Sequence, residues 1–328
     1  MHIEFLEILR CPKTGQKLVS KDPVYRDDQI YSALLVSEDG RYSYPVRDFI
    51  PRFVPESNYA DNFGMQWNKF RQTQLDSYSG HPIPADRFWK ATGWKPEEIS
   101  GRWVLDVGCG AGRFAEIALE AGAKVVALDY SNTINACFDN LKHHPNLHLI
   151  QGDIYALPFP LGPFPFVYSL GVLQHTPDVG KALAALPPMV TAKVGRLCAD
   201  VYWKRLRTML HAKYLVRPIT KRLPQKTLFR LLKATVPSLL KITQLIGRVP
   251  LIGKYLKKMI PVADYTGVYP LDEYQLAEWT LIDTFDILGP QYDSPQSASR
   301  IRQWMENAGL KEIDVLLASL LVVRGVKP

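Results

Sequence analysis

The sequence predicts an α/β fold built on a doubly wound sheet, and three observations support it. Residues 104–107 read as a short buried strand, and three alternate glycines within 108–112 follow it directly. Residues 113–119 then carry the apolar periodicity of an amphipathic helix. Apolar runs at 124–129 and 147–154 repeat the strand pattern, each with an acid near its end. Strands that alternate with helices in this way are typical of a parallel sheet.

The glycine turn at residues 108–112 is the first candidate binding site. Glycine is needed where the backbone takes a positive φ or where a ligand lies directly on it, because a β-carbon would collide. The dinucleotide fingerprint G-x-G-x-x-G would place its third glycine where this chain has Arg113. Asp106, two residues before the first glycine, would repel a pyrophosphate but could hold an ammonium group. Both departures favour a ligand other than a dinucleotide.

The pattern D-x-G-x-G-x-G at residues 106–112 resembles motif I of the class I S-adenosylmethionine (SAM) methyltransferases. The resemblance extends through residues 101–201 and 265–328, which we expect to form the two parts of one catalytic domain. It implies a Rossmann-like sheet of seven strands, SAM as the cofactor and transferase activity. Pro165 and the turn at 193–195 depart from the family pattern. A NAD-dependent dehydrogenase is the alternative for a turn of this kind.

Acids at the ends of the next two strands are further candidates for cofactor contacts. Asp129 lies about 20 residues after the first glycine, where a carboxylate can accept both ribose hydroxyls. The resemblance implies that Asp153 receives the adenine amino group and that Ile154 lies against the ring. A single acid after a strand is more often a helix cap, but acids at successive strand ends favour a cofactor. The predicted cofactor residues are Asp106, Gly108, Cys109, Gly110, Asp129, Tyr130, Asp153, Ile154, Leu170 and Arg71.

Candidates for catalysis are His175, Asp286 and Tyr292. The resemblance implies in-line transfer of a methyl group, in which most of the rate comes from holding donor and acceptor collinear. A general base that removes the proton of the acceptor would add a smaller factor. His175 precedes Thr-Pro and could equally cap the next helix. The acids and tyrosines after residue 264 could equally be counter-ions of the basic segment before them.

The sequence favours a small-molecule acceptor, with O-methylation of a sugar, a lipid-linked compound or a secondary metabolite. Residues 169–172 lack the [DN]-P-P-[YFW] signature that amino-methylating nucleic-acid enzymes carry at this place. We therefore expect no nucleic-acid partner. The alternatives are an RNA methyltransferase that uses the basic insert and a non-catalytic SAM-binding scaffold. A scaffold would be expected to have lost a glycine or an acid of the cofactor turn, and none is missing.

Residues 1–55 predict a small β-rich module. The stretches around Cys11-Pro12 and at 44–51 resemble the two ends of the Trm112-like zinc-ribbon module that often precedes methyltransferase domains. Thr14 stands where that module has its second cysteine, and the region has no other cysteine. Because tetrahedral zinc needs four donors, we expect no metal. The predicted core of the module is Tyr25, Tyr31, Leu34, Val36, Tyr42 and Phe53.

Residues 56–100 are rich in aromatic side chains and predict a linker or lid. Phe63, Trp67 and Phe70 fall on one helical face, at spacings of four and three residues. One interpretation is a helix that packs on the sheet. The other is a lid over the cofactor, in which Arg71 meets the methionine carboxylate or the substrate.

Residues 202–264 predict a basic, amphipathic helical insert that caps the substrate site. Between Val201 and Ala263 the sequence has fifteen lysines and arginines and no acid, so the rest of the chain is net acidic. We expect the prolines to cut the insert into short helices (Pro218, Pro224, Pro237 and Pro250). No uncharged apolar run approaches the roughly 20 residues of a membrane span.

Three interpretations of the insert compete. It could be a solvated basic face over an ordinary helical cap, or a platform that attracts an anionic small substrate such as a phosphorylated or nucleotide-linked sugar. It could also contact anionic lipid headgroups, as a peripheral membrane surface through 202–264. RNA is less favoured, because the insert has few aromatic side chains on which bases could stack.

The composition is that of a globular protein with more than one compact unit. The chain has 328 residues, 47% hydrophobic and 22% charged. Its start is acidic and amphipathic, so we expect no secretory signal. The four cysteines form no close pair, which predicts a reducing, cytoplasmic setting without disulfides. The sequence does not predict an oligomeric state.

Overall fold

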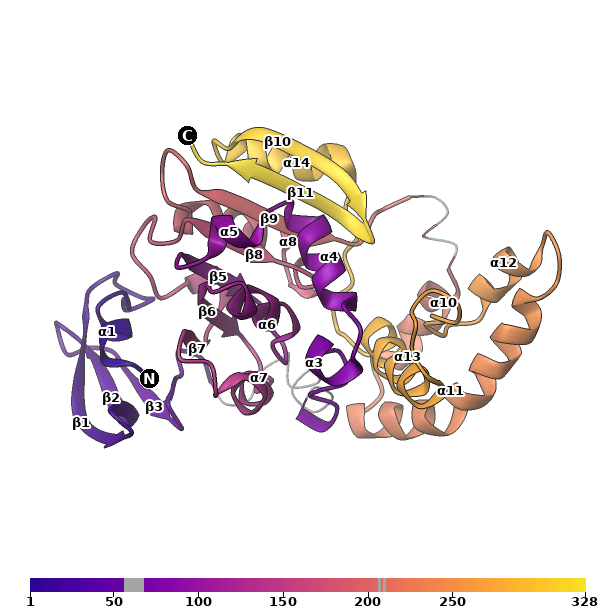
Figure 1. Cartoon of the computed structure of the whole chain (residues 1–328), viewed down its shortest axis with the longest axis horizontal. Helices are drawn as coiled ribbons and strands as arrows, with labels where there is room; N and C mark the ends of the chain where they lie inside the picture. Colours follow the sequence, from indigo (N-terminus) through magenta and orange to yellow (C-terminus); the bar gives the residue numbers. More distant parts are fainter. Residues whose placement is uncertain (56–67, 206–207, 209–210) are drawn as a thin grey trace.

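The computed structural model describes residues 1–55, 68–205, 208 and 211–328. It has three parts along its longest axis: a small N-terminal sheet, a central α/β domain and a helical lobe formed mainly by residues 212–288 (Figure 1). The predicted α/β fold class is confirmed. The aromatic positions Phe63 and Trp67 lie outside the described residues, whereas the ring of Phe70 packs 5.8 Å from that of Phe229 in the lobe.

The central sheet has seven strands in the order β10-β11-β9-β8-β5-β6-β7 (Figure 1). The parallel strands are β5 (Trp103–Val107), β6 (Lys124–Asp129), β7 (Leu147–Gln151), β8 (Phe166–Ser169) and β9 (Arg196–Val201). The chain closes with β10 (Lys311–Ala318) and β11 (Leu320–Val326), and β11 runs antiparallel to both of its neighbours. The strands predicted at 104–107, 124–129 and 147–154 are therefore present as β5, β6 and β7.

The side chains of successive residues in each strand point to opposite faces of this sheet. On one face Val104, Val125 and Phe166 pack under four helices: α4 (Ile83–Thr92), α5 (Pro96–Ile99), α6 (Arg113–Glu120) and α7 (Ile134–Leu141). On the other face Leu105 and Val126 join a core shared with α8 (Val179–Ala184), α14 (Ala298–Asn307) and the N-terminal module. Both faces are covered, which is why the strands read as continuous apolar runs.

The N-terminal module is an antiparallel sheet beside the helix α1 (Ile3–Leu6). Its strands follow chain order: β1 (Leu18–Arg26), β2 (Gln29–Ser37), β3 (Ser43–Arg47) and β4 (Ile50–Pro51). The prediction that Tyr25, Leu34 and Tyr42 form its core is wrong, because these side chains are exposed. Strand alternation buries Ile30 and Leu35 instead.

The module is attached to the edge of the central sheet. The Phe53 N–H donates to the Gln151 carbonyl at the end of β7 over 2.8 Å. The guanidinium of Arg52 donates to the side chains of Gln151 and Asn135, each over 2.8 Å. These contacts cover the free edge that β7 would otherwise present.

The helical lobe contains α10 (Ala212–Thr220), α11 (Gln225–Gly247), α12 (Gly253–Leu256) and α13 (Glu273–Leu288). The expectation that every proline ends a helix is wrong for Pro218 and Pro237, which lie inside α10 and α11. The buried face of α11, which includes Val236 and Leu240, continues past Pro237, so packing outweighs the lost hydrogen bond. No helix among the described residues has the length and apolar content needed to cross a membrane.

Candidate cofactor and active site

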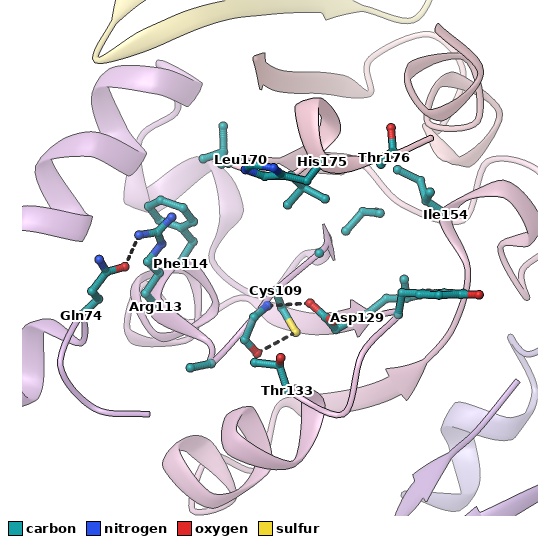
Figure 2. A pocket seen from close by; sticks show the side chains of 18 of the residues that line it. Gln74, Cys109, Arg113, Phe114, Asp129, Thr133, Ile154, Leu170, His175 and Thr176 are labelled. Atoms are coloured by element: carbon teal, nitrogen blue, oxygen red, sulfur yellow. Dashed lines mark hydrogen bonds between the residues drawn. The ribbon is translucent and has the colours of Figure 1, made fainter. Parts of the chain in front are cut away.

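A pocket opens at the carboxyl ends of β5 to β8, where open α/β sheets bind ligands. Its volume is about 1040 Å³, which includes the solvent-filled space at its opening. Figure 2 shows Asp129 and Thr133 on one side of it and Leu170, His175 and Thr176 on the other. Of the predicted cofactor residues, all except Asp106 line it.

The glycine turn between β5 and α6 forms the floor of the pocket. Gly108 has φ +88° and Gly110 has φ +56°, in the left-handed region that disfavours a β-carbon. A β-carbon on Gly108 would lie 2.4 Å from a methyl group of Val172, so this turn admits no side chain there. Over Gly110 there is open space, with no heavy atom within 4 Å of an ideal β-carbon position. A flat ligand can therefore rest on this backbone.

Asp129 ends β6 and holds the glycine turn. Its carboxylate accepts the Gly110 N–H over 2.9 Å, and its other oxygen accepts from the N–H and hydroxyl of Ser131 over 2.8 and 2.7 Å. Burial raises the pKa of this carboxyl above its usual value, although the three hydrogen bonds oppose the shift. The acid is thus fixed in place at the pocket wall (Figure 2).

Asp153 and Ile154 form the wall beyond Asp129. The Asp153 carboxylate accepts the Tyr155 N–H over 2.9 Å and so caps the short helix η1 (Ile154–Ala156). Asp153 therefore caps a helix, one of the two roles that the sequence left open, and it also lines the pocket.

The opposite end of the pocket carries cationic and amide side chains. Arg113 donates to the side-chain oxygen of Gln74, whose amide nitrogen donates to Asp283 over 2.8 Å. Arg71 lies 3.8 Å from the carboxylate of Asp139 and also lines the pocket. Burial lowers the pKa of Arg113. The sequence analysis missed Gln74, because its place depends on α13, about 200 residues later in the chain, and no local pattern marks it.

Asp106 is placed differently from the prediction. Its side chain is 1% exposed and lies within the sheet beneath the turn, beside the buried Tyr168. Burial, reinforced by the negative charge of Asp129, raises the pKa of Asp106 to about 8. It does not line the pocket.

We expect this buried acid to make stability depend on pH. The folded chain keeps the Asp106 proton up to about pH 8, whereas an unfolded chain releases it near the ordinary carboxyl pKa of 3.8. Between these values the folded state binds more protons, so the free energy of unfolding falls as pH rises, by at most about 1.4 kcal/mol per pH unit for one proton. Asp106→Asn should remove this part of the slope in urea unfolding measured at pH 5, 6 and 7 without cofactor. An unchanged slope would contradict the assignment.

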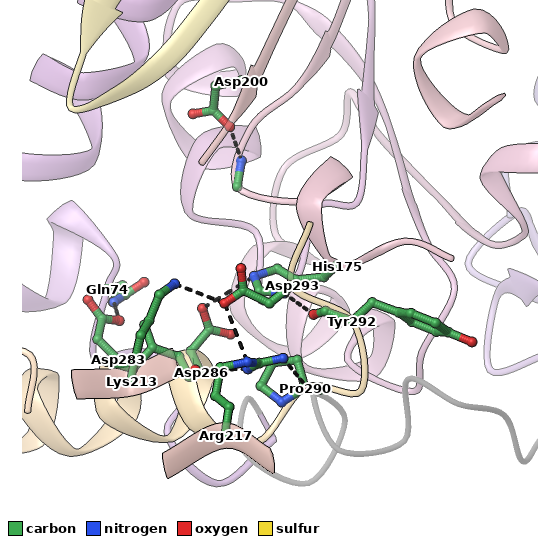
Figure 3. A network of polar contacts seen from close by, with 12 residues as sticks. Gln74, His175, Asp200, Lys213, Arg217, Asp283, Asp286, Pro290, Tyr292 and Asp293 are labelled. Atoms are coloured by element: carbon green, nitrogen blue, oxygen red, sulfur yellow. Dashed lines mark hydrogen bonds and ion pairs between the residues drawn. The ribbon is translucent and has the colours of Figure 1, made fainter. Parts of the chain in front are cut away.

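His175 and Asp286 lie together in the wall of the pocket. His175 belongs to the short helix η2 (Leu173–His175), and its Nδ1 donates to the Tyr292 carbonyl over 3.1 Å. Because a carbonyl can only accept, this contact places the proton on Nδ1 and leaves Nε2 as the acceptor. Nε2 lies 3.9 Å from a carboxylate oxygen of Asp286 on α13. The phenol ring of Tyr292 points away from both residues, and it is the carbonyl of Tyr292 that accepts from His175 (Figure 3).

Buried ion pairs attach the helical lobe beside this site. Asp293 lies 2.8 Å from Lys213 and 3.6 Å from Arg217, both on α10 (Figure 3). Arg217 also donates to the carbonyls of Ile287 and Pro290, each over 2.9 Å. Asp293 is therefore a counter-ion of the basic insert, one of the two roles that the sequence left open for these acids.

A second ion pair holds the loop that follows β8 in place. Asp200 on β9 accepts the Gly171 N–H over 2.5 Å and pairs with Arg87 of α4 over 2.8 Å. Leu170, Gly171 and Val172 line the pocket, so this pair fixes the wall that faces the glycine turn.

Comparison with known proteins agrees with this geometry. Residues 105–190 match the model of a methyltransferase domain. A tRNA U34 carboxymethyltransferase of Shewanella sediminis (strain HAW-EB3) is 39% identical over 119 residues, which are 32% of this chain and 35% of the relative. One from Pseudoalteromonas translucida (strain TAC 125) is 35% identical over 122 residues, which are 34% of this chain and 35% of the relative. The chain thus matches about a third of the length of these relatives.

Among solved structures, the chain is similar to magnesium protoporphyrin IX methyltransferase from Synechocystis PCC 6803 with bound SAH. The TM-score is 0.45 and the identity 14%, over 82% of this chain and 97% of that one. A likeness of this size carries no information on function.

The relatives correct two expectations. Their names describe transfer to a tRNA, so the predictions of a small-molecule acceptor and of no nucleic-acid partner are contradicted. The alternative drawn from the sequence, an RNA methyltransferase, agrees better with them. The prediction of a SAM-dependent enzyme is confirmed. The matched segment contains the glycine turn, Asp129, Asp153 and His175, so the chain carries a SAM-dependent methyltransferase domain over residues 105–190.

Proposed function

We propose that this chain is a SAM-dependent RNA methyltransferase whose substrate is a tRNA. The observation that carries the proposal is the match of about a third of the chain to tRNA U34 carboxymethyltransferases at 35 to 40% identity. Exposed lysines and arginines in the helical lobe, whose helix α13 contributes Asp286 to the pocket, support it. Such a substrate also implies an enzyme of the cytoplasm.

The residues of the pocket fit SAM. The bare backbone over Gly110 leaves room for the cofactor, and a β-carbon at Gly108 would fill the turn. In our proposal Asp129 accepts the ribose hydroxyls, while Asp153 and Ile154 hold the adenine. Arg71, Gln74 and Arg113 then lie at the methionine end, where cationic and amide donors suit a carboxylate. SAM supplies a methyl group on a positively charged sulfur.

His175 is the residue that we assign as the general base. Its Nδ1 is held by the Tyr292 carbonyl, so Nε2 can accept the proton of an RNA nucleophile in the pocket. The carboxylate of Asp286, 3.9 Å away, stabilises the imidazolium that this transfer creates. Tyr292 positions His175 through its backbone carbonyl. In this proposal Tyr292 is therefore a positioning residue, whereas the sequence analysis named it as a candidate for catalysis.

The lobe offers a row of cations for the RNA backbone. Lys221, Arg222, Lys226, Arg230 and Lys233 are exposed, and no ion pair involves them in the part of the chain that the structure describes. The lobe's buried cations are used internally, as in the pair of Lys213 with Asp293. The exposed ones remain available for phosphates, which supply most of the affinity for nucleic acid. Few aromatic side chains are needed for such contacts.

Neutralising part of this row should weaken tRNA binding. In the variant Lys226→Gln/Arg230→Gln/Lys233→Gln, the negative slope of log K against log salt should become shallower by about 3, because each phosphate contact contributes about 0.9 to its magnitude. Fluorescence anisotropy with a labelled tRNA at several salt concentrations measures this. The matched control is Lys13→Gln/Lys17→Gln/Lys21→Gln, which removes the same charge from exposed positions of the N-terminal module. Equal losses in both variants would contradict a specific role of the lobe.

The direct test of the function uses SAM with an isotopically labelled methyl group. Incubation with total tRNA should transfer the label to nucleosides, and mass spectrometry of the digested RNA would identify the methylated base. Label that stays in SAM while SAM binding is intact would overturn the proposal.

The N-terminal module has a place in this proposal. Its sequence resembles a Trm112-like module, and its Cys11 thiol lies 3.4 Å from the Tyr44 hydroxyl. We assign it a supporting role at the adenine end of the pocket, since Arg52 binds the end of β7 directly before Gly152 and Asp153.

A further inference from the structure

The turn between α11 and α12 exposes a group of apolar side chains. It lies at the end of the helical lobe that is farthest from the central sheet (Figure 1). Leu251 is 88% exposed and Ile252 is 54% exposed. The same short segment exposes five further apolar side chains: Leu245, Val249, Tyr255, Leu256 and Met259. We call these seven residues the apolar tip. Exposed apolar side chains gathered in one short segment, rather than scattered singly over the surface, mark interaction sites.

The backbone conformation of Leu251 also indicates that the tip is an interaction site. Leu251 has φ +67°, a conformation that a β-carbon disfavours and that glycine would adopt without strain. Its side chain gains almost no burial within the described chain to compensate. Glycine would adopt this turn with less strain, and a polar side chain would be better solvated. Contacts within the chain therefore do not explain a leucine at this position.

The charge around the tip is of one sign. Residues 202–262 contain no acid, and Arg248, Lys254, Lys257 and Lys258 fall within or beside the tip in the sequence. Arg248 is exposed at the end of α11, whereas Lys257 pairs with Asp264 over 3.3 Å. An occupant of this surface must therefore be apolar at its centre and anionic at its rim.

Three occupants can be compared on these grounds. A second copy of the chain would bring the basic rim against itself in a symmetric dimer, which like charges oppose. RNA would meet the positive charge but would leave the aliphatic side chains without a partner, since only Tyr255 has a ring for stacking. An anionic lipid bilayer satisfies both requirements, because apolar side chains enter the boundary of the acyl chains while cations meet the headgroups.

We propose that the apolar tip inserts into the headgroup region of anionic membranes and holds the enzyme at their surface. The proposal does not depend on the identity of the methyl acceptor. The turn between α11 and α12 lies at the far end of the lobe from the central sheet (Figure 1), whose strand ends line the cofactor pocket, so membrane contact at the tip does not cover these strand ends. The row at Lys221 to Lys233 stays assigned to RNA.

Flotation of the full chain with vesicles tests this. The protein should float with phosphatidylcholine vesicles that contain phosphatidylglycerol and much less with pure phosphatidylcholine. Leu251→Asp/Ile252→Asp should lower the partition coefficient at least tenfold, because it places two charges at the acyl boundary. Arg248→Gln should lower it about fivefold. Leu161→Asp is the matched control: it is 82% exposed in the catalytic domain and should float like the wild type.

Each variant is first checked by circular dichroism and by SAM titration, which these exposed positions should not affect. No flotation of the wild type at low salt would overturn the proposal, and so would equal flotation with neutral vesicles or with Leu251→Asp/Ile252→Asp. If that double variant instead lost tRNA binding while the wild type failed to float, the tip would belong to the RNA surface. Failure of tRNA methylation alone would leave the vesicle result unchanged, so the two proposals fail separately.

Discussion

Replacing His175 by glutamine should lower kcat for tRNA methylation by about 10² to 10⁴-fold, the range that general-base catalysis contributes. The nucleophile then loses the Nε2 acceptor that the Tyr292 carbonyl holds in place. SAM affinity should change little, because the glycine turn and Asp129 are untouched. Single-turnover transfer of labelled methyl groups with saturating SAM separates this effect from binding.

Asp286→Asn is the companion variant. It keeps the shape of the side chain but removes the negative charge 3.9 Å from Nε2, so we expect a smaller loss of kcat than for His175→Gln. Methyl transfer at the wild-type rate by His175→Gln would show that His175 only caps the segment that follows it. In that case positioning alone would account for catalysis.

Asp129→Ala should weaken SAM binding by about 1 to 3 kcal/mol, or about 5 to 150-fold in Kd, through the loss of charged hydrogen bonds. The variant also frees the Gly110 N–H and Ser131, which the carboxylate now holds. Asp129→Asn retains part of this geometry and should fall between the wild type and the alanine variant. Isothermal titration with SAM and with NAD measures both the affinity and the choice of cofactor.

A control for the cofactor pocket is Asp139→Ala, which removes the exposed partner of Arg71 on α7 but leaves the ribose wall intact. Its SAM affinity should stay within a factor of two or so of the wild type, as expected for a surface ion pair. Unchanged affinity in Asp129→Ala would remove Asp129 from the ribose role.

The parts of the site that depend on local sequence could be predicted. A strand, a glycine turn and a helix fix their own geometry, so the sequence could predict that Gly108, Gly110 and Asp129 lie together, and all three line the pocket. Asp106 was misplaced because strand alternation turns its side chain toward the helices that cover the sheet, beside Tyr168. Gln74 was missed because distant segments bring it to the pocket, and no periodicity records such a contact.

The acceptor was predicted wrongly for two physical reasons. The missing [DN]-P-P-[YFW] signature excludes one chemistry, the methylation of amino groups on nucleic acid, and does not exclude RNA as a substrate. The scarcity of aromatic side chains in the insert argues only against base stacking, whereas phosphate contacts need cations alone. Likewise, Pro237 was expected to end a helix, but the buried face of α11 outweighs the hydrogen bond that proline removes.

The attachment of the N-terminal module to β7 has a practical consequence. Arg52 joins Gln151 on β7 to Asn135 on α7, so one guanidinium anchors two elements that lead into the pocket. A truncated protein that began at the catalytic domain would lose this anchor and expose an unprotected strand edge, which invites aggregation. Expression clones of the catalytic domain should therefore keep residues 1–55.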